Sequence, residues 1–352
     1  MALKENDMGI IRRQNFGTFI FLFVLAVGIA VVPFRAESSP PSTKAEFTLR
    51  CAGTMPLDHF MTKALDYFAQ RIDEKTNGRM KIEVYPSNQL FSDKDFPKAL
   101  PSGAVDMAQV NMAMWAGLIP PLAVFDIPFF FRDRDHYNRC LDAPKIRDIL
   151  DREFESKGVK ILYWMDYGYM TLIGKKPIKT LEDFKGKRVR GYGEISNEMI
   201  KNLGGAPVFL SVGEIYIALQ RGTMDGVLTS LGTAYERKFY EVVKYCLLFK
   251  NGELNVPPPV LINLNKFNEL PSEMQKVLND AGKETQGWAF AQCQKGMEEF
   301  LGGMKEKGMD TYYLSDQEKK RWTEANQNLL THYIQRTGKV GKELVEEISK
   351  VR

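Results

Sequence analysis

From Lys185 to Val243 the chain alternates between strand-like and helix-like hydrophobic patterns. Short apolar runs bounded by Gly or Pro predict strands, and apolar positions three to four residues apart predict helices. This order is typical of a small parallel α/β lobe, whose ligands bind beyond the carboxyl ends of the strands. Arg190 and Thr229 lie at such ends and are the first candidates for a binding site. The expected elements are strand 185–190, helix 195–203, strand 208–210, helix 214–220, strand 224–228 and helix 233–245.

The residues before this stretch predict a second α/β lobe. Asp58 is positioned to cap a helix that runs to Lys75 with one apolar face. A further helix is expected from 143 to 156. Alternating apolar positions predict strands at 46–51, 80–85, 105–110 and 160–164.

Two crossings between the lobes are expected, near Tyr167 and near Asn255. The helical pattern from 271 to about 307 is longer than one lobe needs for cover, so this helix is expected to brace both lobes. We therefore predict a two-lobed α/β fold with a cleft between the lobes. Its expected boundaries are 46–167 plus 255–294 for lobe I and 168–254 plus 295–352 for lobe II.

The N-terminus has the pattern of an export signal. Arg12 and Arg13 precede an apolar run from 16 to 32, and small residues follow. Residues 1–36 are therefore expected to be a signal peptide, with 37–45 as a linker, and the folded part is expected in the periplasm. The apolar run is also at the lower limit for spanning a bilayer, so an uncleaved anchor is the alternative.

The composition of the chain argues against nucleic-acid binding and against a metal site. The 352 residues are 44% apolar and 26% charged, with a net charge of +4 and with lysines interspersed among acids. This balance is that of a soluble globular protein, and it offers no basic stripe for nucleic acid. The four cysteines are widely scattered; export permits a disulfide, but core filling is the favoured interpretation. No metal site is expected, because the three histidines are far apart and outside ligand motifs.

Catalytic motifs are missing from the sequence. It has no Gly-rich phosphate loop, no G-x-S-x-G elbow and no Cys-x-x-Cys. We therefore expect neither an enzyme nor a cofactor. A hydrolase or lyase on the same lobes would need a nucleophile or base beside Arg190, and none is evident.

Several candidate site residues have two interpretations. From composition alone, Arg190 reads as an exposed charge; if it points into a cleft, a ligand carboxylate would satisfy it. Core packing is the default for Trp115 and for Tyr169 and Tyr192, although glycines flank both tyrosines and favour pocket roles. His59 precedes the first helix and is a surface residue by default.

Five motifs in order resemble the periplasmic solute-binding proteins of TRAP (tripartite ATP-independent periplasmic) transporters, the DctP-like group. The similarity extends from Glu46 to the C-terminus. Each motif alone is weak, but their order and spacing make the resemblance specific. The motifs occupy 84–90, 124–129, 184–190, 214–220 with Asp225-Gly226, and 238–242.

The resemblance implies closure of two lobes, joined by strands and a shared long helix, over a small organic anion. Arg190 occupies the position of the family's carboxylate-binding arginine, and Thr229 the position of its usual asparagine partner. Met170 stands where a second arginine can occur. Asn111 occupies an acidic position, and Val212 an aromatic position, of the sialic-acid binders.

These departures favour a monocarboxylate with an apolar or aromatic body. Trp115, Tyr169, Met170, Val227 and Leu228 are expected around a single arginine. A C4-dicarboxylate is the alternative, but it would require a second cation that the sequence does not reveal.

The resemblance further implies delivery of the ligand to membrane permease subunits driven by an ion gradient. Two different roles stay open for the same lobe pair: a periplasmic sensor subunit, or the binding protein of an ATP-driven importer. His59 and Tyr192 complete the set of candidate ligand-binding residues.

Overall fold

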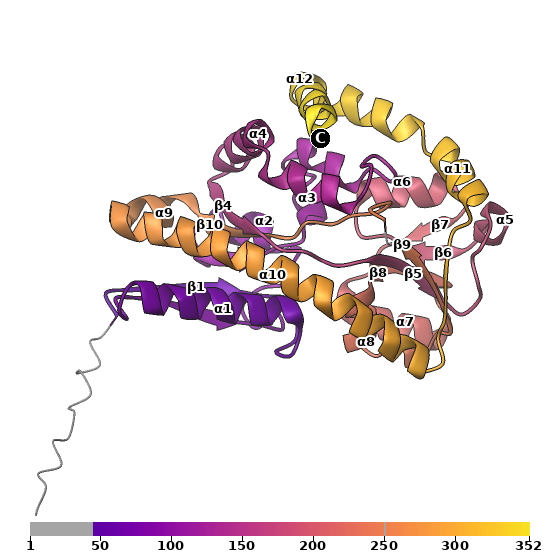
Figure 1. The fold of residues 1–352 in the computed structure, drawn as a ribbon, viewed down its shortest axis with the longest axis horizontal. Helices are drawn as coiled ribbons and strands as arrows, with labels where there is room; N and C mark the ends of the chain where they lie inside the picture. The colour runs from indigo at the N-terminus through magenta and orange to yellow at the C-terminus, as the bar shows by residue number, and fades with distance from the viewer. Residues whose placement is uncertain (1–44, 250) are drawn as a thin grey trace, which may run out of the picture. The chain divides into compact units, whose positions relative to one another are not determined.

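The computed structural model describes residues 45–249 and 251–352. The predicted signal peptide and most of the linker, residues 1–44, lie outside this part. The described chain forms two mixed sheets with helices around them (Figure 1). The first sheet has the order β2-β1-β3-β10-β4 and the second has the order β11-β9-β5-β8-β6-β7.

The first sheet is parallel at one side and antiparallel at the other. β1 is parallel to β2 and β3, whereas β10 is antiparallel to β3 and β4. The strands expected at 46–51 and 80–85 are confirmed, since the bounds of β1 and β2 agree with these ranges to within one residue. The strands are β1 (Phe47–Ala52), β2 (Met80–Tyr85), β3 (Met107–Gln109), β4 (Val159–Trp164) and β10 (Pro259–Asn263).

The second sheet contains the predicted small parallel lobe. β6 is parallel to β7 and β8, whereas β5 is antiparallel to β8 and β9. The strands are β5 (Met170–Gly174), β6 (Arg188–Arg190), β7 (Ala206–Val208), β8 (Gly226–Ser230), β9 (Tyr245–Phe249) and β11 (Asp310–Tyr313).

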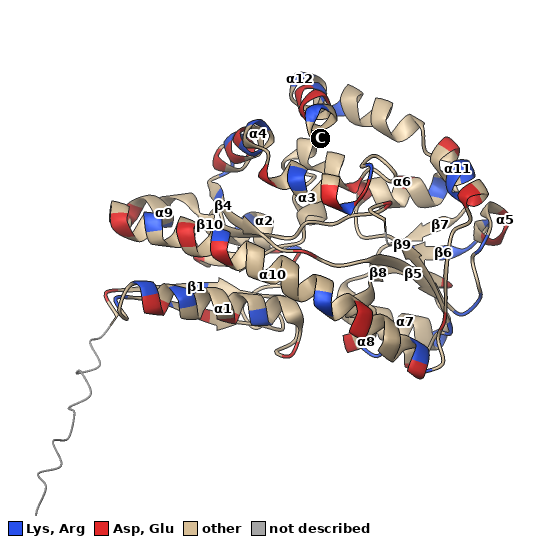
Figure 2. Ribbon diagram, in the orientation of Figure 1, with Lys and Arg blue, Asp and Glu red and all other residues tan. Residues whose placement is uncertain are grey.

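The helices pack around the two sheets. On the outer helices, such as α4, α11 and α12, Lys and Arg are interspersed with Asp and Glu (Figure 2). The α-helices are α1 (Phe60–Lys75), α2 (Phe96–Ala99), α3 (Arg134–Asp142), α4 (Pro144–Glu155), α5 (Leu181–Phe184), α6 (Glu194–Asn202), α7 (Ile215–Arg221), α8 (Leu231–Glu236), α9 (Leu264–Glu269), α10 (Ser272–Glu306), α11 (Asp316–Ala325) and α12 (Asn328–Lys350). The 3₁₀ helices are η1 (Met112–Met114), η2 (Pro120–Asp126), η3 (Val212–Glu214) and η4 (Phe239–Glu241).

Three local predictions are wrong. The cap of α1 is His59, not Asp58, and its ring nitrogen accepts a hydrogen bond from the Met61 N–H. The strand expected at 208–210 ends at Val208, and Phe209 is 76% exposed. The helix expected from 233 to 245 already ends at Glu236, because a turn and a short 3₁₀ helix lead into β9.

The chain crosses between the sheets where the sequence predicts it. One crossing joins β4 to β5 past Tyr167, and another joins β9 to β10 past Asn255. Helix α10 joins the two α/β lobes, packing against α1 and β4 along one half and α8 and β11 along the other (Figure 1). Leu278 and Ala281 belong to an apolar cluster with α1, whereas Met297 and Leu301 belong to one with α7 and α8.

The C-terminal helix α12 packs against η2 and α4 and also touches α6. The residue boundaries proposed above for the two lobes stay a prediction. All four cysteines are buried as free thiols, and burial raises the pKa of Cys51 and of Cys246 to about 12. Their interpretation as core residues is confirmed.

The crossing at Gly168 should tolerate no side chain. Gly168 has φ +78°, and an added Cβ would lie 2.5 Å from the Met297 sulfur on α10. We expect Gly168→Ala to lower the free energy of unfolding by about 1–3 kcal/mol in denaturant titrations. Gly287→Ala is the matched control, since Gly287 is helical and its Cβ would meet nothing within 4 Å. That change should stabilise by about 0.5–1 kcal/mol; equal effects of the two changes would contradict this account.

Candidate ligand-binding site

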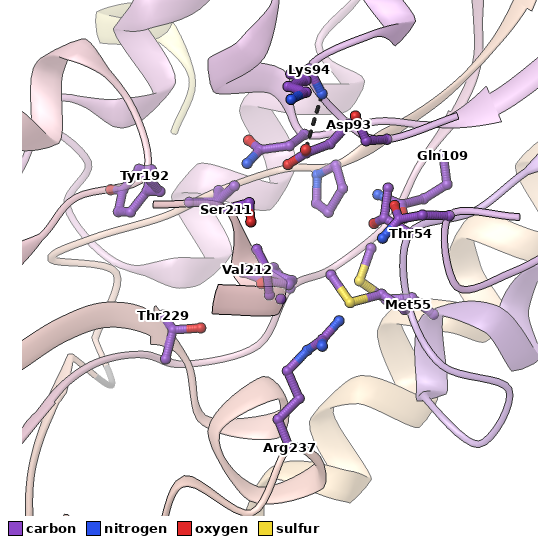
Figure 3. Close-up of a pocket in the computed structure, with 18 of the residues that line it drawn as sticks. Thr54, Met55, Asp93, Lys94, Gln109, Tyr192, Ser211, Val212, Thr229 and Arg237 are labelled. Carbon is purple, nitrogen blue, oxygen red and sulfur yellow. Dashed lines mark hydrogen bonds between the residues drawn. The ribbon is translucent and has the colours of Figure 1, made fainter. Parts of the chain in front are cut away.

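A cavity of about 220 Å³ lies between the two sheets (Figure 3). A single water needs only about 10–15 Å³ on this measure, so the cavity has room for a small organic molecule. Its lining comes from the carboxyl ends of parallel strands of both sheets, where such folds bind ligands. The lining residues after β1, β2 and β3 are Thr54, Met55, Asn88, Ser92, Asp93, Lys94, Gln109 and Asn111; those at or after β6, β7, β8 and α8 are Arg190, Tyr192, Ser211, Val212, Gly213, Leu228, Thr229 and Arg237.

Arg190 is the last residue of β6 and is held on both sides by the sheet. It pairs in register with Val208 of β7 and Val227 of β8. The side chain lines the cavity, yet the residue is only 5% exposed. Its Nε donates a hydrogen bond to the Leu210 carbonyl at 3.1 Å, and burial lowers the pKa of the guanidinium. The interpretation of Arg190 as an exposed surface charge is therefore wrong.

Six of the nine predicted site residues line the cavity. Asn111 also accepts a hydrogen bond from the Ala113 N–H at 3.0 Å, which fixes its amide at the start of η1. Tyr192 is 5% exposed, and within the described chain its hydroxyl has no hydrogen-bond partner. The six are Asn111, Met170, Arg190, Tyr192, Val212 and Thr229.

The other three predicted residues lie outside the cavity lining. Trp115 is fully buried and packs on Phe154, with ring centroids 5.9 Å apart. The Tyr169 ring packs against the Arg134 guanidinium at 5.3 Å. His59 is buried at the start of α1, not on the surface. The glycines beside Tyr169 and its loop position favoured a pocket role, but its ring packs against Arg134 and does not belong to the cavity lining.

Sequence reasoning missed Arg237, Gln109, Asp93 and other lining residues. Arg237 matters most because it is a second cation in the cavity lining, half-buried and with its Nε buried. It follows the last residue of α8, and its guanidinium points into the cavity beside Met55 (Figure 3). The signal that could have revealed it is its position directly before the motif at 238–242.

His59 and Glu236 link α1 to α8 next to the cavity. The His59 Nδ1 accepts from the Met61 N–H at 3.2 Å, and its Nε2 lies 3.1 Å from a Glu236 oxygen. Thr233, also on α8, donates a hydrogen bond to the cavity residue Tyr167 at 3.1 Å. Burial lowers the pKa of His59 to about 3 and raises that of Glu236 to about 7. His59 is therefore held as a neutral imidazole whose Nε2 lies next to Glu236.

A family model, "Bacterial extracellular solute-binding protein, family 7", matches residues 51–336. The chain belongs to this family. A solute-binding protein of Sulfitobacter sp. (strain NAS-14.1) is 32% identical over 276 residues, covering 77% of this chain and 81% of the relative.

Two solved family structures have the same fold. A TRAP periplasmic solute-binding protein from Sulfurospirillum deleyianum with bound succinate matches with a TM-score of 0.79 and 27% identity, covering 88% of this chain and all of that one. One from Roseobacter denitrificans with bound β-D-glucuronate matches with a TM-score of 0.81 and 25% identity, covering 87% and 100%.

Membership makes this chain a solute receptor of a periplasmic binding family. The predicted resemblance and the two-lobed fold are confirmed. Within 45–249 and 251–352, every helix is too short or too polar to cross a membrane. The apolar run at 16–32 lies outside the described residues.

The neutral state of His59 predicts an acid-dependent loss of stability. In the unfolded chain this imidazole titrates near its ordinary value of 6.5, whereas burial lowers its folded pKa to about 3. Below pH 6.5 the unfolded state therefore binds the extra proton, and this contribution to stability falls as pH falls. From pH 7 to pH 5 the His59 contribution should fall by about 2 kcal/mol, while Glu236, whose folded pKa is raised to about 7, contributes in the opposite direction over the same range.

His59→Asn removes this titration while keeping an acceptor for the Met61 N–H. Denaturant titrations at pH 7 and pH 5 should show a smaller acid-dependent loss in the variant than in the native protein. Equal losses would show that His59 is not held neutral in the folded state.

Proposed function

We propose that the protein is exported through its N-terminal signal and acts as an extracytoplasmic receptor for a small organic carboxylate, which Arg190 binds. The receptor would deliver this ligand to the membrane permease subunits of an ion-gradient-driven TRAP transporter. The solved relatives are described as TRAP periplasmic solute-binding proteins, which favours delivery over a sensor role. Their bound succinate and glucuronate are both organic acids.

The buried guanidinium of Arg190 carries this proposal. Its Nε is satisfied by the Leu210 carbonyl, and no carboxylate in the described part of the chain forms an ion pair with it. An unpaired buried charge costs several kcal/mol, so a cation kept in this position favours an anionic ligand. A carboxylate can accept two parallel hydrogen bonds from one guanidinium, which fixes its orientation. The Thr229 hydroxyl, also in the cavity lining, adds a neutral donor or acceptor.

The apolar part of the cavity lining favours an apolar segment in the ligand. Met55, Met61, Met170 and Leu228 belong to this lining, and methionines adapt their shape to irregular surfaces. This supports the apolar body that the sequence predicts. The monocarboxylate prediction assumes that the site contains a single arginine. The cavity lining contains two, because Arg237 lines the same cavity as Arg190.

Binding would work by closure of the two lobes. The crossings near Tyr167 and Asn255 would act as hinges, and closing them would exclude water from the pair of Arg190 and carboxylate. A ligand shifts the equilibrium only by its differential affinity for the closed form. Lining residues from both sheets provide that difference, because they surround the ligand together only when the lobes are close.

A thermal-shift screen of the purified protein against organic acids and neutral sugars tests this proposal. A bound acid at about 100 times its dissociation constant should stabilise the protein by about 2.7 kcal/mol. Arg190→Met should weaken binding of that acid by at least about 100-fold, because a charged hydrogen-bonded pair is lost. Arg190→Lys should restore part of the affinity, since lysine keeps the charge but lacks the planar fork.

Arg188→Met is the matched control, because Arg188 belongs to the same strand but is exposed and pairs with Asp225. Its effect on affinity should be small. Stabilisation by no organic acid would overturn the receptor proposal, and full affinity in Arg190→Met would overturn the role of Arg190.

A further inference from the structure

Arg237 enters the cavity from a different element than Arg190. It is the residue after α8, and its backbone N–H closes the last turn on the Thr233 and Tyr235 carbonyls. The side chain extends from this helix end toward Met55 and Val212 (Figure 3). The two guanidinium groups therefore belong to one cavity but are fixed by separate parts of the second lobe.

Arg237 differs from the half-buried Arg134 in forming no ion pair within the described chain, although the neighbouring Glu236 carboxylate also acts on its pKa. Its Nε is buried without a hydrogen-bond partner among the described residues, and no ion pair to it is formed there. Arg134, by contrast, forms an ion pair with Asp166 and donates to the Gly168 carbonyl at 3.0 Å. Burial correspondingly lowers the pKa of Arg237. Arg237 thus has donors available for a ligand.

The charged side chains of the cavity lining are unbalanced. Arg190, Arg237 and Lys94 are cations, and among the described residues Asp93 is the sole carboxylate in the lining, which leaves a net charge of +2. Asp93 is half-buried and next to the exposed Lys94, so it compensates the interior only in part. A ligand with one negative charge would leave one arginine unpaired when the lobes close.

We propose that Arg237 determines specificity by binding a second anionic group, and that the ligand is a dianionic organic acid. One carboxylate of this acid is bound by Arg190, the second anionic group is bound by Arg237, and an apolar segment joins them. The inference rests on the proposed function, since it assumes that Arg190 binds a carboxylate in this cavity. Arg237 is then the second cation that a dicarboxylate ligand requires.

The position of this second cation differs from the one that the resemblance implies. The resemblance places a second arginine at the position of Met170, which lies on β5 and here is an apolar side chain. Arg237 comes from the end of α8 instead. The two anionic groups of the ligand would therefore have a different spacing and direction from those expected with an arginine at position 170.

Paired ligands test whether the second charge is recognised. Isothermal titration calorimetry would compare the α,ω-dicarboxylates from malonate to adipate with their half-amides, which keep the shape but remove one charge. The native protein should bind its preferred diacid roughly 10- to 100-fold more tightly than the half-amide, because one charge-assisted hydrogen-bonded pair is lost. Arg237→Met should remove this preference by lowering the affinity for the diacid more than the affinity for the half-amide, and Arg237→Lys should keep most of it.

Lys238→Met is the matched control, since Lys238 is the adjacent exposed cation and does not line the cavity. It should leave the preference unchanged. An undiminished preference in Arg237→Met would overturn the inference. Equal affinity for the diacid and the half-amide would also overturn it, and so would binding of monocarboxylates alone through Arg190. Either of these two results would leave the proposed receptor function intact. Binding of no acid in calorimetry or in the thermal-shift screen would overturn both proposals.

Discussion

The desolvated guanidinium of Arg190 is the constraint on which the site depends. A charge can stay buried only if its surroundings supply hydrogen bonds and a counter-charge. Within residues 45–249 and 251–352, the Arg190 side chain donates one hydrogen bond, to the Leu210 carbonyl. The side chain cannot withdraw, because β7 and β8 flank its strand on both sides. The sheet thus holds a cation in place at the boundary between the lobes, where Asp93 acts on its pKa but no carboxylate of the described residues forms an ion pair with it.

The fold holds the first lobe next to this cation of the second lobe through a few connections. Helix α10 belongs to the cores of both lobes, so its two halves cannot move independently without bending the helix. The His59 and Glu236 contact adds a polar link between α1 and α8, close to the cavity. These contacts leave the crossings near Tyr167 and Asn255 as the proposed hinges.

Local hydrophobic patterns predicted most of the fold and part of the site. β1, β2 and α10 have clear periodicity because each buries one regular face, and Arg190 and Thr229 were found because strand ends are where α/β sheets bind ligands. The burial of Trp115 and Tyr169 depends on partners distant in sequence, such as Phe154 and Arg134, which no local pattern reveals. Arg237 was missed because a helix extended to residue 245 places it on a helix face, whereas α8 ends at the residue before it.

The end of α8 connects lobe contact with charge in the cavity. Glu236 and Arg237 are adjacent, and one reaches the start of α1 while the other reaches into the cavity. Any change in the position of α8 relative to α1 must therefore move the Arg237 guanidinium within the cavity. Conversely, a ligand group that binds Arg237 restrains α8 and favours the arrangement in which Glu236 meets His59. By this geometry the affinity for the anion and the contact between the lobes depend on the same two turns of helix.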